Sequence, residues 1–219
     1  HRVYRRQRQM GIRESPSTSL PGTTISLKNT QLGTRMTPSK AQVPLLTNAN
    51  AQWKLYDRPA QYPKSTTLPV QWVTMPDGTR LAVYVTLPAD ESGRPVNEKF
   101  PVILIQTAYS AGVAGKVSAI AGGADPEMVK RGYATVVADV RGTGNSAGKW
   151  EAFGNVEQAD AYQLIDWSSK QNFSDGKVGL YGVSYLGITA VLGATTQHPA
   201  IKAAFPIVPM GDAYRDILF

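Results

Sequence analysis

Two continuous apolar runs constrain the fold of this chain more than any other feature of its sequence. The first spans residues 100–107 and contains Pro101-Val102-Ile103-Leu104-Ile105, and the second spans residues 133–140. Runs without polar alternation are typical of strands that are covered on both faces of a parallel sheet. A helical pattern over Asp125–Arg131, ended by Gly132, lies between them. This order of strand, helix and strand predicts an α/β fold.

The flanking segments extend this pattern in both directions. Residues 70–75 and 81–87 enclose the turn Pro76-Asp77-Gly78-Thr79, which predicts an antiparallel hairpin. Further along the chain we expect, in order, a helix at 155–171, a strand at 178–183, a helix from Ser184 to about Gln197, and a sixth strand at 202–208. The helix at 155–171 is expected to pack through Val156, Ala159, Tyr162, Leu164 and Ile165. The prediction is a mixed, mostly parallel sheet with helices on both faces and an N-terminal antiparallel hairpin.

Charge and composition divide the chain into two parts. Residues 1–40 carry eight basic residues and one acid, whereas the rest carries 15 of each sign, so the formal charge of +7 comes from the N-terminal segment. We therefore expect no nucleic-acid partner, since binding would need a basic patch on the folded domain. Residues 1–65 are polar and aperiodic, which predicts a basic, largely irregular leader before a domain at 66–219. Within the leader, the aromatic segment Gln52–Tyr62 is the part expected to pack on the domain.

Other classes of protein are disfavoured by what the sequence lacks. There is no cysteine, which removes disulfides and thiolate metal sites and leaves the compartment open. No apolar run approaches the roughly 20 residues of a membrane span, so we expect no membrane partner. Residues 1–20 contain no apolar stretch of the kind found in an intact signal peptide.

The segment Gly182-Val183-Ser184-Tyr185-Leu186-Gly187 places a serine between a predicted strand and a predicted helix. A nucleophile elbow has this arrangement, because its sharp turn holds the serine Oγ above the end of the sheet. The general pattern has a second glycine two residues after the serine, where this chain has Leu186. The other interpretation is a glycine-flanked turn without chemistry. We expect Ser184 to be a nucleophile, and the backbone N–H of Tyr185, at the positive end of the helix dipole, to face a developing oxyanion.

Two further motifs accompany the elbow, namely Asp139-x-Arg141-Gly142-x-Gly144-x-Ser146-x-Gly148 and Asp175-Gly176-Lys177-Val178-Gly179. With Ser184-Tyr185-Leu186-Gly187, they resemble the cocaine-esterase and Xaa-Pro dipeptidyl-peptidase (CocE/NonD-type) family of α/β hydrolases over roughly residues 65–219. The resemblance implies an α/β-hydrolase fold and a serine hydrolase without cofactor or metal. It also implies an oxyanion role for the Tyr185 N–H.

Tyr109 follows the strand at 100–107, at the edge where α/β sheets gather their ligands. The same resemblance implies that its hydroxyl is the second oxyanion donor. The other interpretation is a loop tyrosine whose hydroxyl is bound locally.

A dinucleotide site is the competing interpretation of Gly142-x-Gly144-x-x-Ala147. That fingerprint should open a helix at once, but Gly148-Lys149-Trp150 prolongs the loop. The acid expected about 20 residues later should end a strand, whereas Asp160 falls inside a predicted helix. We therefore prefer the hydrolase, with Asp139 and Arg141 in structural contacts.

A serine nucleophile needs a base, and the chain has only His1 and His198. His198 lies 14 residues beyond Ser184, and at 1.5 Å per residue a helix would carry it roughly 20 Å away. His1 lies beyond the long leader. In α/β hydrolases the acid and histidine follow the serine, and the resemblance implies that they lie on loops after later strands. Asp212 and Asp216 are the acids downstream, and Asp212 is a minor candidate for the triad acid.

We therefore expect the triad acid and histidine to be absent from this chain. The expected chain is an N-terminal portion, truncated after about the sixth strand and inactive alone. The predicted parent activity is hydrolysis of carboxylic esters or related small acyl compounds, with Xaa-Pro dipeptide release from short peptides as the alternative. A third possibility, of another class, is an inactive or binding remnant. The sequence specifies neither oligomeric state nor localisation.

Overall fold

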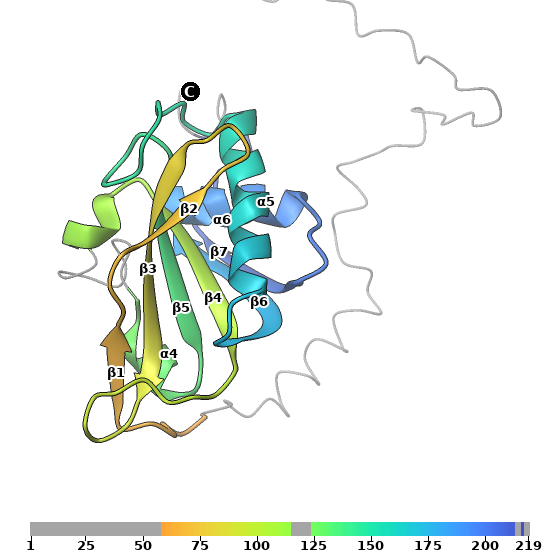
Figure 1. Cartoon of the computed structure of the whole chain (residues 1–219). Helices are drawn as coiled ribbons and strands as arrows, with labels where there is room; N and C mark the ends of the chain where they lie inside the picture. The colour runs from red at the N-terminus through yellow and green to blue at the C-terminus, as the bar shows by residue number, and fades with distance from the viewer. Residues whose placement is uncertain (1–57, 115–123, 213–215, 217–219) are drawn as a thin grey trace, which may run out of the picture. The chain divides into compact units, whose positions relative to one another are not determined.

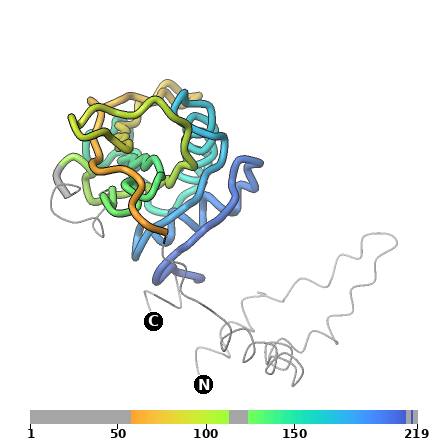
Figure 2. Tube along the Cα trace, turned by 90° about the horizontal axis from the view of Figure 1, so that it is seen from below, coloured from red at the N-terminus to blue at the C-terminus, as the bar shows by residue number. Residues whose placement is uncertain are grey.

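A mixed sheet of seven strands organises the part of the chain that the computed structural model describes, residues 58–114, 124–212 and 216 (Figure 1). The strands are β1 (Lys64–Thr67), β2 (Gln71–Thr74), β3 (Arg80–Ala89), β4 (Phe100–Thr107), β5 (Ala134–Asp139), β6 (Ser174–Val183) and β7 (Ile201–Ile207). Their order across the sheet is β1-β3-β5-β4-β6-β7, and β2 also pairs with β3. β1 and β7 therefore lie at the two ends of this order, and Figure 2 shows the same chain seen from below.

The N-terminal strands are antiparallel and the central ones are parallel. β1, β2 and β5 each pair antiparallel with β3, which confirms the predicted hairpin between β2 and β3. β5, β4, β6 and β7 run parallel to one another, as predicted for the central strands. In parallel strands the carboxyl ends lie at one edge of the sheet, so the residues that follow β4, β5 and β6 are brought together there.

The sequence did not predict β1, which begins inside the segment expected to be irregular. Its four residues, Lys64–Thr67, are polar and are held by pairing with β3, with Thr66 opposite Leu87. Because of this extra strand, the elbow follows the sixth strand of the described chain and the last strand is the seventh. Nearby, Tyr62 packs edge-to-face on Phe100, with ring centroids 5.5 Å apart. The expected packing of the aromatic segment is confirmed for Tyr62, while Trp53 and Tyr56 lie outside the described residues.

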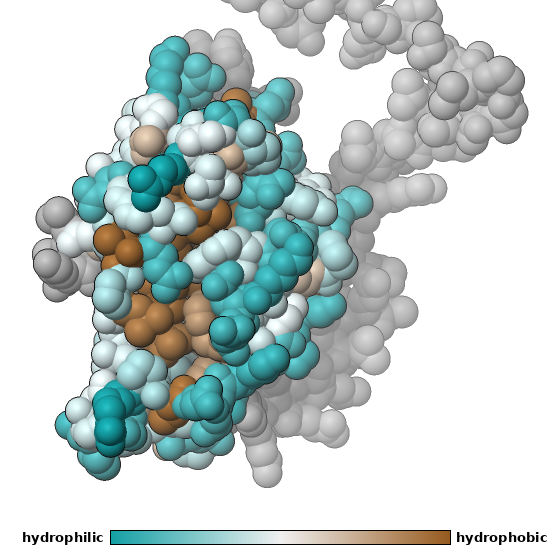
Figure 3. All heavy atoms as spheres, in the orientation of Figure 1, coloured by the Kyte–Doolittle hydropathy of each residue, from teal (hydrophilic) through white to brown (hydrophobic). Residues whose placement is uncertain are grey.

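Both apolar runs form strands that are buried on two faces, as their composition predicted. Val102 and Leu104 of β4 pack with Leu164 and Ile165 on one side. Ile105, the next residue of β4, packs on the other side with side chains that surround the elbow. Figure 3 shows apolar side chains gathered over β3 and its neighbours on the face toward the viewer.

The described helices are α4 (Pro126–Lys130), α5 (Asn155–Ser169), α6 (Tyr185–Thr195) and a short π-helix, η2 (Ser110–Ala114). α5 and α6 pack against each other and against β4 and β6, whereas α4 contacts β1 and β3. Asp125 caps α4, since its side chain accepts the N–H of Glu127 at 2.9 Å. None of these helices combines the length and apolar composition that a membrane crossing requires.

The predicted apolar side of α5 was partly wrong. Val156, Ala159 and Tyr162 are exposed, whereas Leu164 and Ile165 are buried as expected. The buried face also contains two carboxylates, Glu157 and Asp160. Buried charges require partners, and here the partners come from other elements, which a count of apolar residues along one helix does not reveal.

Candidate active site

Ser184 occupies a strained backbone conformation between β6 and α6. Its φ of 58° and ψ of −124° lie outside the regions favoured by residues other than glycine, and such conformations cost about 1–3 kcal/mol. Two hydrogen bonds hold it: its N–H donates to the carbonyl of Ile207 at 3.0 Å, and its carbonyl accepts from the N–H of Ile188 at 3.0 Å. This is the sharp strand-to-helix turn that the sequence predicted at this residue.

The positions of the glycines explain why Leu186 is tolerated in the elbow. A Cβ on Gly182 would collide with the backbone and Cβ of Leu186, and a Cβ on Gly187 would press on the carbonyl of Ile207. Gly182 thus leaves room for the first turn of α6, and Gly187 lets α6 approach β7. The second glycine is therefore needed one residue later than in the general pattern.

Tyr109 meets Ser184 although the two residues are 75 positions apart. The Tyr109 hydroxyl lies 3.4 Å from the Ser184 Oγ, and its backbone N–H donates to the Thr107 hydroxyl at 3.0 Å. β4 and β6 are parallel neighbours, so their carboxyl ends deliver both residues to the same edge of the sheet. Ser184, Tyr185 and Tyr109, the three residues predicted for the site, are thus brought together.

Asp139 fixes the segment that carries Tyr109. Its fully buried carboxylate accepts the N–H of Ala111 at 2.6 Å and the N–H of Asn145 at 2.9 Å. Burial raises the pKa of Asp139, although these two hydrogen bonds act in the opposite direction. Gly144 has a φ of +53°, and a Cβ there would collide with this carboxylate. The loop after β5 therefore wraps tightly around Asp139.

Arg141 ties the same loop to α5 and to the hairpin turn. Its Nε and Nη2 donate to the carboxylate of Asp160 at 2.8 and 2.7 Å, and its Nη1 donates to Asp77 at 2.6 Å. These contacts are structural, as predicted for Arg141. No helix opens at Gly142 or Gly144, since α5 begins only at Asn155, and this geometry does not fit the dinucleotide alternative.

The Tyr185 side chain is bound more closely than the sequence suggested. Its hydroxyl accepts from Trp150 Nε1 at 2.9 Å and donates to the Glu157 carboxylate at 2.8 Å. Burial raises the pKa of both Tyr185 and Glu157. Sequence reasoning missed Glu157 and Trp150, since neither lies in a motif and both meet Tyr185 only through tertiary packing.

His198 is engaged away from the elbow. Its Nε2 lies 3.5 Å from Asp166 Oδ1, its Nδ1 accepts the N–H of Ala200 at 3.1 Å, and its ring packs on Tyr162. Both ring nitrogens have partners at the far end of α6, which agrees with the expectation that it is not the base. Asp212 is exposed beyond β7, where its N–H donates to Asp216 at 2.9 Å. His1 lies outside the described residues.

Comparison with known proteins identifies the family of the chain and so decides between a hydrolase and a dinucleotide-binding protein. The model of the X-Pro dipeptidyl-peptidase (S15) family matches residues 77–219, which is well over half of the chain. The chain belongs to the S15 family. The match begins in the hairpin turn and includes the loop after β5 and the elbow.

Relatives with curated names match about two thirds of the chain. A Mycobacterium bovis protein named as a serine esterase is 35% identical over 165 residues, which is 68% of this chain and 25% of that protein. The cocaine esterase of Rhodococcus is 36% identical over 147 residues, 65% of this chain and 24% of the esterase. The chain therefore spans about a quarter of the length of the curated relatives it matches.

A solved structure confirms the fold. A CocE/NonD family hydrolase from Staphylococcus aureus superposes with a TM-score of 0.60 at 27% identity, over 70% of this chain and 29% of that one. The predicted α/β-hydrolase fold and the predicted family are thus both confirmed.

Proposed function

We propose that this chain supplies the nucleophile and the oxyanion site of a serine hydrolase that acts on carboxylic esters. The observation that carries the proposal is the 3.4 Å approach of the Tyr109 hydroxyl to the Ser184 Oγ at a strained elbow. A phenolic donor beside a serine hydroxyl is placed to bind the oxygen of a carbonyl under attack. Family membership supports hydrolysis as the class of reaction.

The reaction proceeds by acyl transfer. Ser184 Oγ adds to the ester carbonyl while a histidine takes its proton, and the carbonyl oxygen becomes an oxyanion bound by the Tyr109 hydroxyl and the Tyr185 N–H. Collapse expels the alcohol, which recovers the proton, and water then releases the acid from Ser184 in the same two steps. His198, the one histidine in the described residues, is bound elsewhere, so we place the base outside them.

Release of Xaa-Pro dipeptides is the alternative, favoured by the description of the family. The chemistry at Ser184 is the same for esters and amides, so the elbow does not discriminate between them. We place esters first because the relatives with the broader match bear esterase names. Assays of the complete protein on an aryl ester and on an X-Pro arylamide separate the two activities.

The mechanism is tested by substitutions in the complete protein. We expect Ser184→Ala to abolish hydrolysis and Tyr109→Phe to lower kcat by about 10²–10³, the usual cost of one oxyanion donor. Tyr133→Phe, which removes a phenol outside the site, is the control. Full turnover by Tyr109→Phe would remove its hydroxyl from the mechanism. The 219-residue chain alone should hydrolyse esters no faster than its Ser184→Ala variant, and Ser184-dependent turnover would show that it contains a base.

A further inference from the structure

Glu157 is a buried carboxylate that the proposed chemistry does not use. It lies in the first turn of α5 with 6% of its surface exposed. Its two oxygens lie 2.8 and 2.9 Å from the Tyr185 hydroxyl, which donates to them. Burying a carboxylate is costly unless it is well bound, so the position of Glu157 calls for an explanation in terms of Tyr185.

The Tyr185 phenol is held from several sides. Trp150 Nε1 donates to its hydroxyl at 2.9 Å, in addition to the bonds with Glu157. Its ring lies against Phe153, with centroids 4.7 Å apart, and meets Tyr109 at 6.2 Å in an edge-on arrangement. One side chain therefore braces both proposed oxyanion donors, since Tyr185 supplies the N–H and its ring supports the tyrosine that supplies the hydroxyl.

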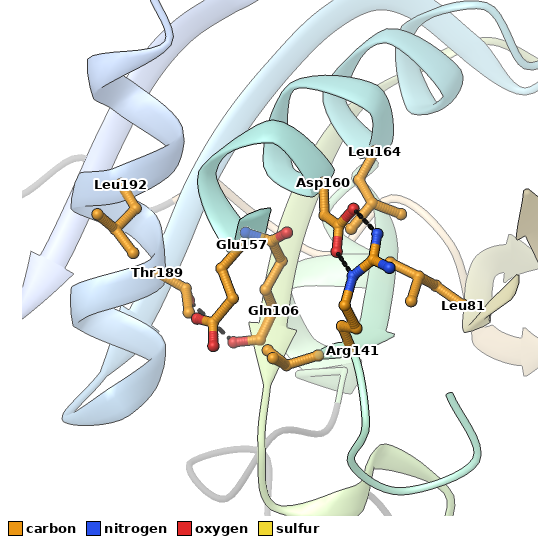
Figure 4. A pocket seen from close by; sticks show the side chains of 9 residues that line it. Leu81, Gln106, Arg141, Glu157, Asp160, Leu164, Thr189 and Leu192 are labelled. Carbon is orange, nitrogen blue, oxygen red and sulfur yellow. Dashed lines mark hydrogen bonds and ion pairs between the residues drawn. The ribbon is translucent and has the colours of Figure 1, made fainter. Parts of the chain in front are cut away.

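The surroundings of Glu157 leave its side chain little freedom. Figure 4 shows it beside Gln106 and Thr189. These three residues line a cavity of about 10 Å³ together with Arg141 and Asp160. This volume is at the lower limit for one water molecule. Between Asp160 and Arg141, the dashed lines in Figure 4 join both carboxylate oxygens to the guanidinium. The Arg141 guanidinium thus donates hydrogen bonds to Asp160, whereas Glu157 accepts its hydrogen bonds from the Tyr185 hydroxyl.

We propose that Glu157 is a positioning residue of the oxyanion site, which acts by holding the Tyr185 phenol so that the Tyr185 N–H and the Tyr109 hydroxyl keep their places beside Ser184. The inference rests on the proposed function. Glu157 touches neither Ser184 nor the carbonyl under attack in this scheme, and its effect passes through Tyr185. We therefore expect substitution of Glu157 to lower kcat and to leave substrate binding nearly unchanged.

The test compares kcat and KM on an aryl ester for variants of the complete protein. We expect Glu157→Ala and Tyr185→Phe each to lower kcat by about 10- to 100-fold, the cost of misplacing a catalytic group by a fraction of an ångström to 1 Å, with KM within about twofold. The double variant should be no slower than the worse single variant, because both break the same contact. Glu157→Gln, which keeps one acceptor but no charge, should lose about fivefold. Glu151→Gln, an exposed acid near α5, is the control and should be unchanged.

A pH profile adds a readout that a merely structural role would not move. The ratio of wild-type to Glu157→Gln activity cancels the titration of the histidine and of every other common group. The titratable and charged groups that face Glu157 are Tyr185, Asp160 and Arg141, and Trp150 is an uncharged donor beside it. All of them are present in both proteins. The ratio should fall toward one as the pH is lowered and Glu157 takes up its proton. A ratio that is constant with pH would contradict the proposal.

The other outcomes are equally separable. If Ser184→Ala keeps its activity, the proposed function fails regardless of Glu157. If Ser184→Ala is inactive while Glu157→Ala and Tyr185→Phe match the wild type, only the positioning role is wrong. Should Glu157→Ala not fold, Tyr185→Phe and Glu157→Gln, which preserve the volume, still give the decisive comparison. Additive losses in the double variant would also overturn the inference.

Discussion

Arg141 contacts one buried and one exposed carboxylate, so substitutions of the two acids compare the strength of a buried ion pair with that of an exposed one. The side chains of Arg141 and Asp160 are 10% and 6% exposed, whereas that of Asp77 is 53% exposed. The nitrogen–oxygen distances are similar, 2.7 Å to Asp160 and 2.6 Å to Asp77. Asp160 accepts a second short hydrogen bond at 2.8 Å, whereas the second bond to Asp77 is 3.4 Å long, so burial and bidentate geometry both favour the contact with Asp160.

The expected magnitudes follow from this contrast. Removing one partner of a buried ion pair costs about 3–5 kcal/mol, and we expect Asp160→Asn to fall near 3 kcal/mol, since Arg141 keeps Asp77. With a urea m-value of about 2 kcal/mol per M, the unfolding midpoint should fall by about 1.5 M. Asp77→Asn should shift the midpoint far less, because solvent screens an exposed pair.

The assay is urea unfolding of the 219-residue chain at pH 7, followed by far-ultraviolet circular dichroism. Repeating it in 1 M NaCl should reduce the small effect of Asp77→Asn and leave that of Asp160→Asn almost unchanged, because salt screens exposed charges most. Equal midpoint shifts for the two variants would refute the reasoning. So would an Asp160→Asn protein as stable as the wild type.

Two further predictions concern the elbow and acid stability. Gly182→Ala should destabilise the protein by about 1–3 kcal/mol, because its Cβ would collide with the backbone of Leu186. Gly179→Ala, in the same strand, meets nothing closer than 3.8 Å and is the control in thermal unfolding; equal losses for both would contradict the steric argument. Hydrogen bonding to Arg141 lowers the pKa of Asp77 from 3.8 to about 2, so the stability contributed by its charge is present above pH 4 and is lost as the pH falls through about 2. The difference in unfolding midpoint between wild type and Asp77→Asn should therefore shrink from pH 4 to pH 2, and a difference that grows would reverse the assignment.

Much of the fold could be predicted because a strand that is buried on both faces has an uninterrupted run of apolar residues. β4 occupies residues 100–107 as expected, and β5 lies within the predicted run at 133–140. β1 has no such apolar run, since Lys-Ser-Thr-Thr is polar and becomes a strand only by pairing with β3. Local pattern thus identifies strands that are stabilised by their own side chains and misses one that depends on its neighbour.

The candidate site shows the same division. Ser184 and Tyr109 could be placed together, because parallel strands deliver their carboxyl ends to one edge. Glu157 could not be placed at the site from the sequence, because an acid on a helix is ordinarily assigned to the solvent side. Its partner Tyr185 lies 28 residues away, and only the packing of α5 on α6 joins them. Contacts of this kind are properties of the tertiary structure.

The strained backbone of Ser184 has an evolutionary consequence. Glycine would adopt its φ of 58° without penalty, so folding stability alone favours replacement of this serine. Under the proposed mechanism, a lineage released from selection for hydrolysis would gain stability by replacing Ser184 with glycine, and the proposed nucleophile should be lost before the sheet. We therefore expect serine at this position to mark those related sequences that retain the proposed chemistry, which the apolar strands around it do not.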